Sequence, residues 1–494
     1  MWLEVFLVFV IVCILAYLDT KKPKNFPPGP DWIPILGSAL AVAKLRNQTG
    51  YLYQACAELS KKYGPVVGLR VGKDRQVVCF GYPAIREMLH KDDFDGRPRG
   101  PFYETRTWGK RQGLLVTDEE LWVEQRRFVL RQLREFGFGK RTMAQLVEEE
   151  AYQLVQLFKQ EVQNGGAIIP MRDAFSVPVL NTLWSMMAGI RYSPQDKELK
   201  KIQSLLTELF ANIDMVGALF SQFPILRYVA PERSGYKSFV SIHQKVWKFL
   251  RNELDNHKET FNPDEMRDIM DVYLKTLKSE DKTDTFSESQ LLAICMDMFM
   301  AGSETTSKSL GFGFLYLLLH PDVQKKAQAE IDKVVGRDRL PSLNDRPNMP
   351  YLEAITYESV RVFMGRTFSI PHRALRDTTL QGYFIPKDTM LIANFNGVLM
   401  DKEFWNDPEI FRPERFLNEQ GTIHVPDQYL PFGAGKHQCM GQTLARSNIF
   451  LLTASILQNF DLSIPPGEEP PSTLGVDGVT PSTGEYNAWV TLRV

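Results

Sequence analysis

Cysteine is scarce in this sequence, and its spacing excludes two common kinds of scaffold. The 494 residues include five cysteines, widely spread and without a C-x-x-C pair: Cys13, Cys56, Cys79, Cys295 and Cys439. An odd number at such spacing argues against a disulfide framework and against a structural zinc site. A reducing compartment fits the pattern better than an oxidising one.

The chain also lacks an excess of charge of either sign, a low-complexity segment and a detectable repeat. Its formal net charge is −1, which gives no sign of a nucleic-acid partner. No G-x-G-x-x-G or P-loop motif stands in a βαβ pattern, so no nucleotide-binding domain is evident. No composition shift marks a domain boundary. We therefore predict one large catalytic domain over residues 37–494, mainly α-helical with a small β region.

Long apolar runs are confined to the first eighteen residues, where only Glu4 interrupts the run. A run of this length can just span a bilayer as a helix. No positive charge precedes it and no A-x-A site closes it, so residues 1–20 predict a membrane anchor rather than a cleaved signal peptide. Residues 21–36 are basic and rich in proline, which predicts a stiff hinge. The lysines after the run favour a cytosolic position for the domain.

Hydrophobic periodicity locates several elements. Apolar residues recur at helical spacing over 142–162, which predicts a helix. Short apolar runs predict strands at 65–71, 76–81 and 389–395. The polar segment 278–285 predicts an exposed loop.

A glycine-rich loop, "PFGAGKHQCMG", surrounds Cys439. A free buried cysteine is usually only a small hydrophobic residue, but that alternative leaves Gly433, Gly435 and Gly441 unexplained. Glycines let a backbone approach a flat ligand, and they let N–H groups point at a thiolate. Phe432 offers an apolar face to a macrocycle. These features predict that Cys439 is a ligand of haem iron.

The segment from residue 287 to residue 320 predicts one helix about 50 Å long. Ser287 and Gln290 form a capping box at its start. Small and polar residues interrupt its middle, at 301–306. A satisfied polar patch or a helix crossing would explain them. A groove that admits a small molecule and supplies protons would explain them too, and a break in an otherwise consistent element favours this functional interpretation.

Glu358 and Arg361 stand three residues apart on a predicted helix and therefore share a face. Such a pair is usually exposed, but the neighbours here are apolar. We predict that the pair is buried and that Arg415 completes an Arg–Glu–Arg network bracing the segment that leads to Cys439.

Four motifs follow in order: A-G-x-E-T-T at 301–306, E-x-x-R at 358–361, P-E-R-F at 413–416 and F-x-x-G-x-[RH]-x-C-x-G at 432–441. With the anchor and the hinge, they resemble the cytochrome P-450 family of haem-thiolate monooxygenases over the whole chain. The resemblance implies that family's fold, haem b, and insertion of one oxygen atom from O2 into an apolar substrate. It also implies electrons from NADPH through a flavoprotein reductase, and an endoplasmic reticulum membrane location with the catalytic domain in the cytosol.

The resemblance also implies roles for single residues. Cys439 would be the axial ligand that favours O–O cleavage. Thr305, with Glu304, would hydrogen-bond dioxygen at the iron and relay protons, while Ala301 and Gly302 would make room for it.

Haem contacts follow from the same resemblance. "LWVEQRR" matches the family's W-x-x-x-R pattern. The expected haem-binding residues are Arg97, Trp122, Arg126, Ala301, His372, Phe432, His437 and Cys439. Many relatives have arginine where this chain has His437, whose charge can change near neutral pH. We therefore predict that haem affinity or potential depends on pH.

A cluster of basic residues is the predicted docking patch for the reductase, although a solvated helix face is an equally simple interpretation for most members taken singly. The cluster comprises Arg126, Arg127, Arg131, Arg134, Lys140, Arg141 and Lys436.

The substrate is the least constrained feature. The chain most resembles insect microsomal members and, among them, the methyl farnesoate epoxidases of juvenile hormone synthesis. The alternative is hydroxylation of a sterol, a fatty acid or a foreign compound. Family resemblance places five residues around the substrate, although all could simply be core residues: Phe102, Leu114, Ala301, Phe368 and Val479.

Two rivals come from other classes of haem protein. A haem-thiolate isomerase or dehydratase would need neither O2 nor a reductase, and Thr305 argues against it. A haem-binding sensor without turnover should carry an output domain, and no segment of this sequence reads as one. Turnover that depends on O2 and NADPH separates the three classes.

Overall fold

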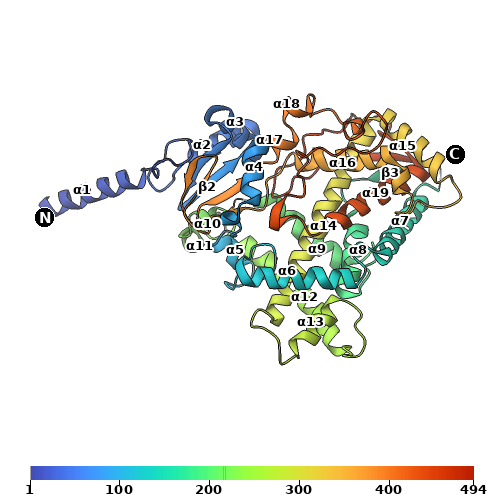
Figure 1. The fold of residues 1–494 in the computed structure, drawn as a ribbon, viewed down its shortest axis with the longest axis horizontal. Helices are drawn as coiled ribbons and strands as arrows, with labels where there is room; N and C mark the ends of the chain where they lie inside the picture. The colour runs from blue at the N-terminus through green and yellow to red at the C-terminus, as the bar shows by residue number, and fades with distance from the viewer. Residues whose placement is uncertain (1, 164, 215, 217, 494) are drawn as a thin grey trace.

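The computed structural model describes residues 2–163, 165–214, 216 and 218–493. Met1 and Val494, the outer ends of the predicted anchor and domain, lie outside the described residues, as do Asn164, Met215 and Gly217. The described part is mainly helical, with small sheets, and confirms the predicted fold class (Figure 1).

Helix α1 (Trp2–Asp19) extends away from the rest of the molecule, and none of its residues is buried (Figure 1). Within the described residues it is the one helix long and apolar enough to cross a membrane. Its end is tied to the first strand, because the Asp19 carboxylate accepts hydrogen bonds from Arg70 Nη1 and Nη2, both at 2.8 Å. Arg70 also lies over the Trp32 ring. These contacts fix the direction in which the candidate anchor leaves the domain.

Helices α2 to α13 cover the first part of the domain. They are α2 (Ala39–Thr49), α3 (Leu52–Tyr63), α4 (Gly81–His90), α5 (Pro101–Thr105), α6 (Glu119–Glu135), α7 (Arg141–Glu161), α8 (Ser176–Ala188), α9 (Lys197–Asn212), α10 (Leu219–Gln222), α11 (Leu226–Val229), α12 (Tyr236–Glu259) and α13 (Ile269–Leu277). The second part contains α14 (Glu288–Leu319), α15 (Pro321–Val334), α16 (Pro350–Met364), α17 (Asn396–Leu399), α18 (Lys402–Trp405) and α19 (Gln442–Asn459). Helix α7 confirms the helix predicted over 142–162, and 278–285 is a loop as expected.

The strands form three small sheets. They are β1 (Val66–Val71), β2 (Asp74–Cys79), β3 (Ala167–Pro170), β4 (His372–Arg373), β5 (Thr378–Leu380), β6 (Tyr383–Ile385), β7 (Met390–Ala393), β8 (Phe460–Ser463) and β9 (Asn487–Leu492). The largest sheet has the order β1-β2-β7-β4, with β2 and β7 parallel and the other pairs antiparallel. Strands β1, β2 and β7 confirm the three predicted strands.

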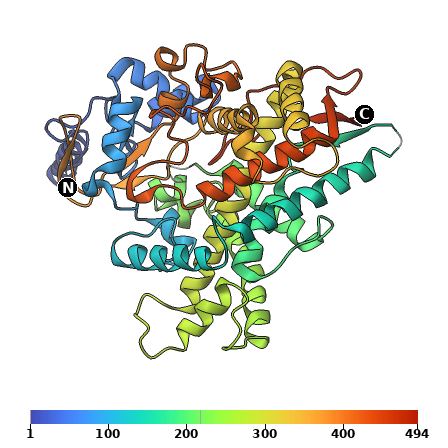
Figure 2. The ribbon, with the colours of Figure 1, turned by 45° about the vertical axis from the view of Figure 1, so that its right-hand side comes forward.

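Helix α14 crosses the interior, with α8, α12, α16 and α19 packed against it (Figures 1 and 2). The Ser287 side chain caps its start by accepting a hydrogen bond from the Gln290 N–H at 3.1 Å, which confirms the predicted N-cap. The Gln290 side chain bonds to the backbone of Gly113 instead, at 2.9 and 3.2 Å, so the reciprocal half of the predicted capping box is absent. Most of its residues are buried on all sides, as expected for a core helix that is apolar around its whole circumference.

The predicted Arg–Glu–Arg network is present and buried. Arg361 donates to the Glu358 carboxylate from Nε at 2.6 Å and from Nη2 at 2.8 Å, and both side chains are 0% exposed. Arg415 Nε lies 3.4 Å from the same carboxylate. Arg361 also donates to the backbone carbonyls of Leu399 and Pro408, each at 2.8 Å. The network therefore joins α16 to the long segment that precedes Cys439.

Removing one partner of this network should destabilise the protein strongly. In Arg361→Met, the buried Glu358 carboxylate keeps too few partners, and we expect a loss of about 3–5 kcal/mol in the free energy of unfolding. Denaturant titration followed by circular dichroism measures the loss.

Lys61→Met is the matched control, since Glu58 and Lys61 also form an i,i+3 pair, but with side chains that are 45% and 71% exposed. The control should lose less than about 1 kcal/mol. Equal losses in the two variants would contradict the expectation that burial of the Glu358–Arg361 pair makes its disruption costly.

Candidate active site

The loop that carries Cys439 is shaped by glycine. Gly435 has φ +70°, and a Cβ there would lie 2.1 Å from the backbone oxygen of Leu89. A larger residue would therefore push the loop off α4. The Cys439 N–H donates to the Phe432 carbonyl at 2.9 Å, which closes the loop just before α19.

Cys439 is exposed as a residue, while protein atoms crowd its sulfur. Burial raises the pKa of the Cys439 thiol, and the N–H groups of Gly441 and Gln442 together with the charge of Arg126 act in the opposite direction. Backbone N–H groups aimed at a sulfur are suited to a metal-bound thiolate. Cys56, Cys79 and Cys295 are buried, and burial raises their thiol pKa values further.

Aromatic and basic side chains gather beside this loop. The ring of His437 lies 4.1 Å from that of Trp122 and 5.1 Å from that of His372. The guanidinium of Arg126 lies 5.3 Å from the Trp122 ring, and its Nη2 donates to the Gln438 carbonyl at 2.6 Å. The structure thus brings residues predicted from α6, β4 and the cysteine loop into one cluster.

Arg97 joins this cluster and is 4% exposed. Its Nη1 donates to the carbonyls of Ile370 and Pro371 at 3.2 and 3.0 Å. Its buried Nε has no partner among the described residues. Burial lowers the pKa of Arg97 to about 10, so the side chain remains a cation at neutral pH. A buried cation with a spare donor fits a carboxylate of haem, and a cysteine sulfur such as that of Cys439 is a ligand type that haem iron takes.

The surroundings of His437 favour its neutral form, and the predicted dependence of haem affinity or potential on pH stays a prediction. Burial, with Arg97 and His372 nearby, lowers its pKa to about 2. Its Nε2 lies 2.9 Å from the Asp95 carbonyl, so the neutral ring donates there. Burial also lowers the pKa of His372 to about 3 and that of His243, on α12, to about 3.

The middle of α14 is accessible on one side. Ala301 is exposed and Thr305 is partly buried, although the residues around them are largely buried. Thr305 Oγ1 donates to the Ala301 carbonyl at 2.8 Å. Gly302 faces α8 instead, since a Cβ there would lie 2.3 Å from Leu183 Cδ2. Its small size therefore serves helix packing, and the role expected for it beside dioxygen stays a prediction.

Glu304 is paired with a residue that the sequence analysis missed. Its carboxylate lies 2.9 Å from Lys308 Nζ, and both side chains are nearly buried. Lys308 also donates to Thr480 Oγ1 at 3.1 Å. The i,i+4 spacing on a predicted helix was the available signal. Glu304 and Lys308 line a small polar recess together with Arg172, Asp173, Ser176, Thr207, Ser307, Gly311, Ser482 and Thr483.

The residues predicted to surround the substrate lie in different hydrophobic clusters. Leu114 and Val479 belong to the main hydrophobic core, and Phe102 packs against it. Phe368 packs instead against two smaller clusters beside the largest sheet. A buried carboxylate, Asp297, was not predicted: it pairs with Arg106 and accepts from the backbone N–H groups of Leu114 and Leu115 at 2.6 and 2.8 Å. It thereby holds the loop that carries Leu114 against α14.

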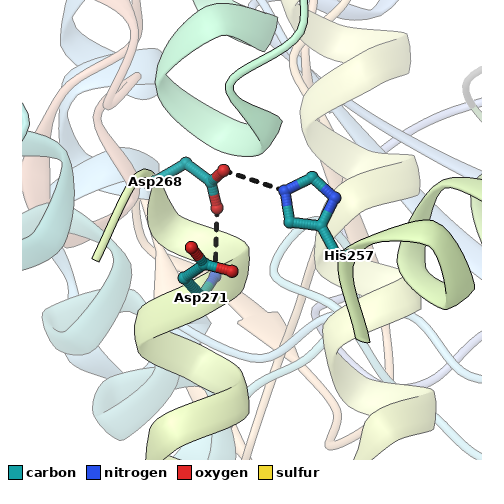
Figure 3. A group of neighbouring side chains, drawn as sticks. All are labelled: His257, Asp268 and Asp271. Carbon is teal, nitrogen blue, oxygen red and sulfur yellow. Dashed lines mark hydrogen bonds and ion pairs between the residues drawn. The ribbon is translucent and has the colours of Figure 1, made fainter. Parts of the chain in front are cut away.

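His257, Asp268 and Asp271 form another buried cluster, drawn in Figure 3. His257 Nε2 lies 2.8 Å from Asp268 Oδ2, and Asp268 Oδ1 accepts from the Asp271 N–H at 3.0 Å. Arg267 donates to both oxygens of Asp271, at 2.6 and 2.8 Å. The charges are already balanced by protein groups, so the cluster serves as the cap of α13 rather than as a metal centre.

The structure thus places an exposed cysteine in a glycine-rich loop just before α19, with arginines beside it, and this arrangement is suited to a haem-thiolate protein. The family model for cytochrome P450 matches residues 27–486, and the chain belongs to that family. The family consists of haem b monooxygenases that act on hydrophobic substrates with NADPH electrons supplied through a reductase.

Three curated relatives illustrate the similarity. "Probable cytochrome P450 303a1" of Drosophila melanogaster is 47% identical and "Farnesoate epoxidase" of Bombyx mori is 36% identical, each over 97% of both chains. "Cytochrome P450 2J2" of Homo sapiens is 34% identical over 92% of this chain and 89% of its own.

Buried neutral imidazoles should make the protein sensitive to mild acid. The unfolded chain binds protons below pH 6.5 at His243, whereas the folded chain does not until about pH 3. The contribution of His243 to the free energy of unfolding is therefore fully present above pH 6.5 and is lost as the pH falls. At pH 5 the loss is about 2 kcal/mol.

Denaturant titrations at pH 7 and pH 5 test this expectation. His243→Gln should reduce the pH dependence of the free energy of unfolding by about 2 kcal/mol. His424→Gln, at an exposed position, is the control and should keep the wild-type dependence. An unchanged dependence in His243→Gln would refute the assignment.

Proposed function

We propose that this monooxygenase epoxidises methyl farnesoate at its terminal double bond, in juvenile hormone biosynthesis. The choice of substrate rests on the 36% identity, over 97% of both chains, with a relative named farnesoate epoxidase. The residues proposed to surround the substrate are apolar, which is compatible with a farnesoid ester.

In this proposal Cys439 would ligate the haem iron. Arg97, Arg126 and Trp122 would hold the haem carboxylates, with His372 and His437 as neutral neighbours, and Phe432 and Ala301 would contact the macrocycle. When bound, haem b supplies the redox chemistry that activates dioxygen. The N–H groups after Cys439 stabilise its thiolate form.

Residues of α14 would supply protons to the site. The Thr305 hydroxyl, which donates to the Ala301 carbonyl, is positioned to turn and hold a proton on the accessible side of the helix. Glu304 supports this proton supply from the polar recess, where Lys308 is its partner. Phe102, Leu114, Phe368 and Val479 bound the space for the apolar substrate and exclude water from it.

A second candidate is hydroxylation of a sterol, a fatty acid or a foreign compound. This alternative stays open because the relative at 47% identity is more similar than the farnesoate epoxidase, and its name states no substrate. A haem-binding sensor without turnover is the non-enzymatic rival, and O2- and NADPH-dependent product formation excludes it.

The proposed location is the endoplasmic reticulum membrane, with residues 1–20 as the anchor, 21–36 as the hinge and the catalytic domain, 37–494, facing the cytosol. The reductase is proposed to dock on a groove of about 670 Å³ beside α6. Its basic lining comprises Arg126, Arg127, Arg131, Arg134, Lys140 and Lys436. Lys436 is partly neutralised by Asp92 and Asp95, at 2.8 and 3.0 Å, and Arg131 by Glu135, at 3.1 Å, so the remaining basic residues carry most of the attraction.

Product analysis tests the substrate. The purified protein, checked by the reduced carbon-monoxide spectrum of a thiolate haem, is incubated with reductase, NADPH and methyl farnesoate. We expect an epoxide that depends on NADPH and O2. No product from a protein with an intact spectrum and an active reductase would refute this substrate and leave hydroxylation of other apolar compounds to be screened.

Charge reversal tests the docking groove. Arg127→Glu with Arg134→Glu should raise the KM for reductase about tenfold at low salt and weaken its dependence on ionic strength, because steering between opposite charges is lost. Lys325→Glu with Lys333→Glu on α15 makes the same change in net charge on exposed positions of another helix. An equal effect of both pairs would reject the groove as the docking site.

A further inference from the structure

We propose that Asp118 is the positioning residue of the haem carboxylate site: one buried carboxylate that holds together the three segments carrying Arg97, Trp122 and His372. The inference rests on the proposed function in so far as it assumes that this cluster binds haem.

Asp118 accepts hydrogen bonds on both of its carboxylate oxygens. Its Oδ2 accepts hydrogen bonds from the backbone N–H of Arg97 at 2.8 Å and from Arg373 Nη2 at 2.9 Å. Its Oδ1 accepts from Arg111 Nη1 at 2.8 Å. Both carboxylate oxygens are therefore engaged by donors, two of which are charged.

The two arginines complete the clamp on Arg97. Arg373 Nε donates to the Arg97 carbonyl at 2.9 Å, and Arg111 Nη2 donates to the same oxygen at 3.3 Å. The backbone N–H and C=O of Arg97 are thus both held by the Asp118 network. The guanidinium of Arg97 keeps its spare buried donor, Nε, in a fixed place.

The chain positions of these residues explain the reach of the network. Asp118 is the residue before α6, so Trp122 follows it by one helical turn and Arg126 by two. Arg373 directly follows His372 in β4. Residues 95 and 96 form bridges with Arg373. One carboxylate therefore sets the spacing among α6, β4 and the Arg97 segment.

Burial makes a charged acceptor necessary. The side chains of Asp118 and Arg373 are each 4% exposed. Burial raises the pKa of Asp118, but hydrogen bonds from Arg111 and from the Arg97 N–H outweigh it and lower the pKa to about 2. Asp388 also pairs with Arg373, at 2.8 Å, but it is 57% exposed and is a weaker counter-ion. An amide in place of Asp118 would leave two arginines with too little negative charge.

The experiment compares Asp118→Asn with Asp268→Asn in the haem-loaded protein. Asp268 is an equally buried carboxylate, 1% exposed, that caps α13 in the cluster of Figure 3, away from the cysteine loop. The readouts are the rate of haem transfer to an excess of apomyoglobin, the haem reduction potential, and the melting temperature.

We expect Asp118→Asn to release haem at least tenfold faster than the wild type and to shift the potential. Asp268→Asn should lower the melting temperature without either change. Arg373→Gln gives the same test in a variant that keeps Asp118, should Asp118→Asn not fold, and Asp388→Asn is its control. Arg373→Gln should also release haem faster.

Wild-type haem transfer rates in Asp118→Asn, or an acceleration that Asp268→Asn matches at equal loss of melting temperature, would overturn the proposal. A wild-type protein that binds no haem would overturn the proposed function as well. Haem binding without epoxide formation would refute only the substrate, because haem transfer is measured without substrate.

Discussion

Burial of α14 along nearly its whole length is the constraint on which the rest of the structure depends. A helix that is enclosed on all sides must pair every polar side chain within the protein, since water cannot reach it. Asp297 is paired with Arg106 and with two backbone N–H groups, and Glu304 is paired with Lys308. Between these two compensated charges lies the one stretch where Ala301 is exposed. The accessible face is therefore a defined interruption in a closed core.

Two other buried carboxylates, outside α14, are also paired within the protein, each at the centre of a small hydrogen-bond network. Glu358 joins α16 to the segment before the cysteine loop, and Asp118 joins α6 to β4. Each has two arginine partners and also accepts a backbone N–H, from Arg412 and from Arg97 respectively. Such networks cost desolvation and are weak evidence of net stability. Their physical consequence is geometric, because each fixes the distance between segments that are far apart in the sequence.

Local patterns made much of this architecture predictable. The Ser287 cap located the start of α14, and the E-x-x-R spacing with apolar neighbours predicted a buried pair, because the residues of each signal lie within a few positions of one another. The partners of Asp118 and Asp297 could not be predicted in this way. Arg373 is 255 residues from Asp118, and Arg106 is 191 residues from Asp297, so only the folded chain brings them together. The neutral state of His437 escaped prediction for the same reason, since burial determines it.

The neutral imidazole of His437 limits the positive charge gathered beside the cysteine loop. Arg97 and Arg126 already place two cations in this cluster. Their charges repel each other, and the charge of Arg126 contributes to the lowered pKa of Arg97. Haem b carries two propionates, so on the proposed arrangement two cations match two anions. A third arginine at position 437 would have to displace the ring packed 4.1 Å from that of Trp122, and its charge would face Arg97 across a buried space. Histidine keeps the aromatic contact and a hydrogen bond to Asp95 without adding a charge, and it leaves the charge balance of the site to the two arginines that the Asp118 network and α6 hold in place.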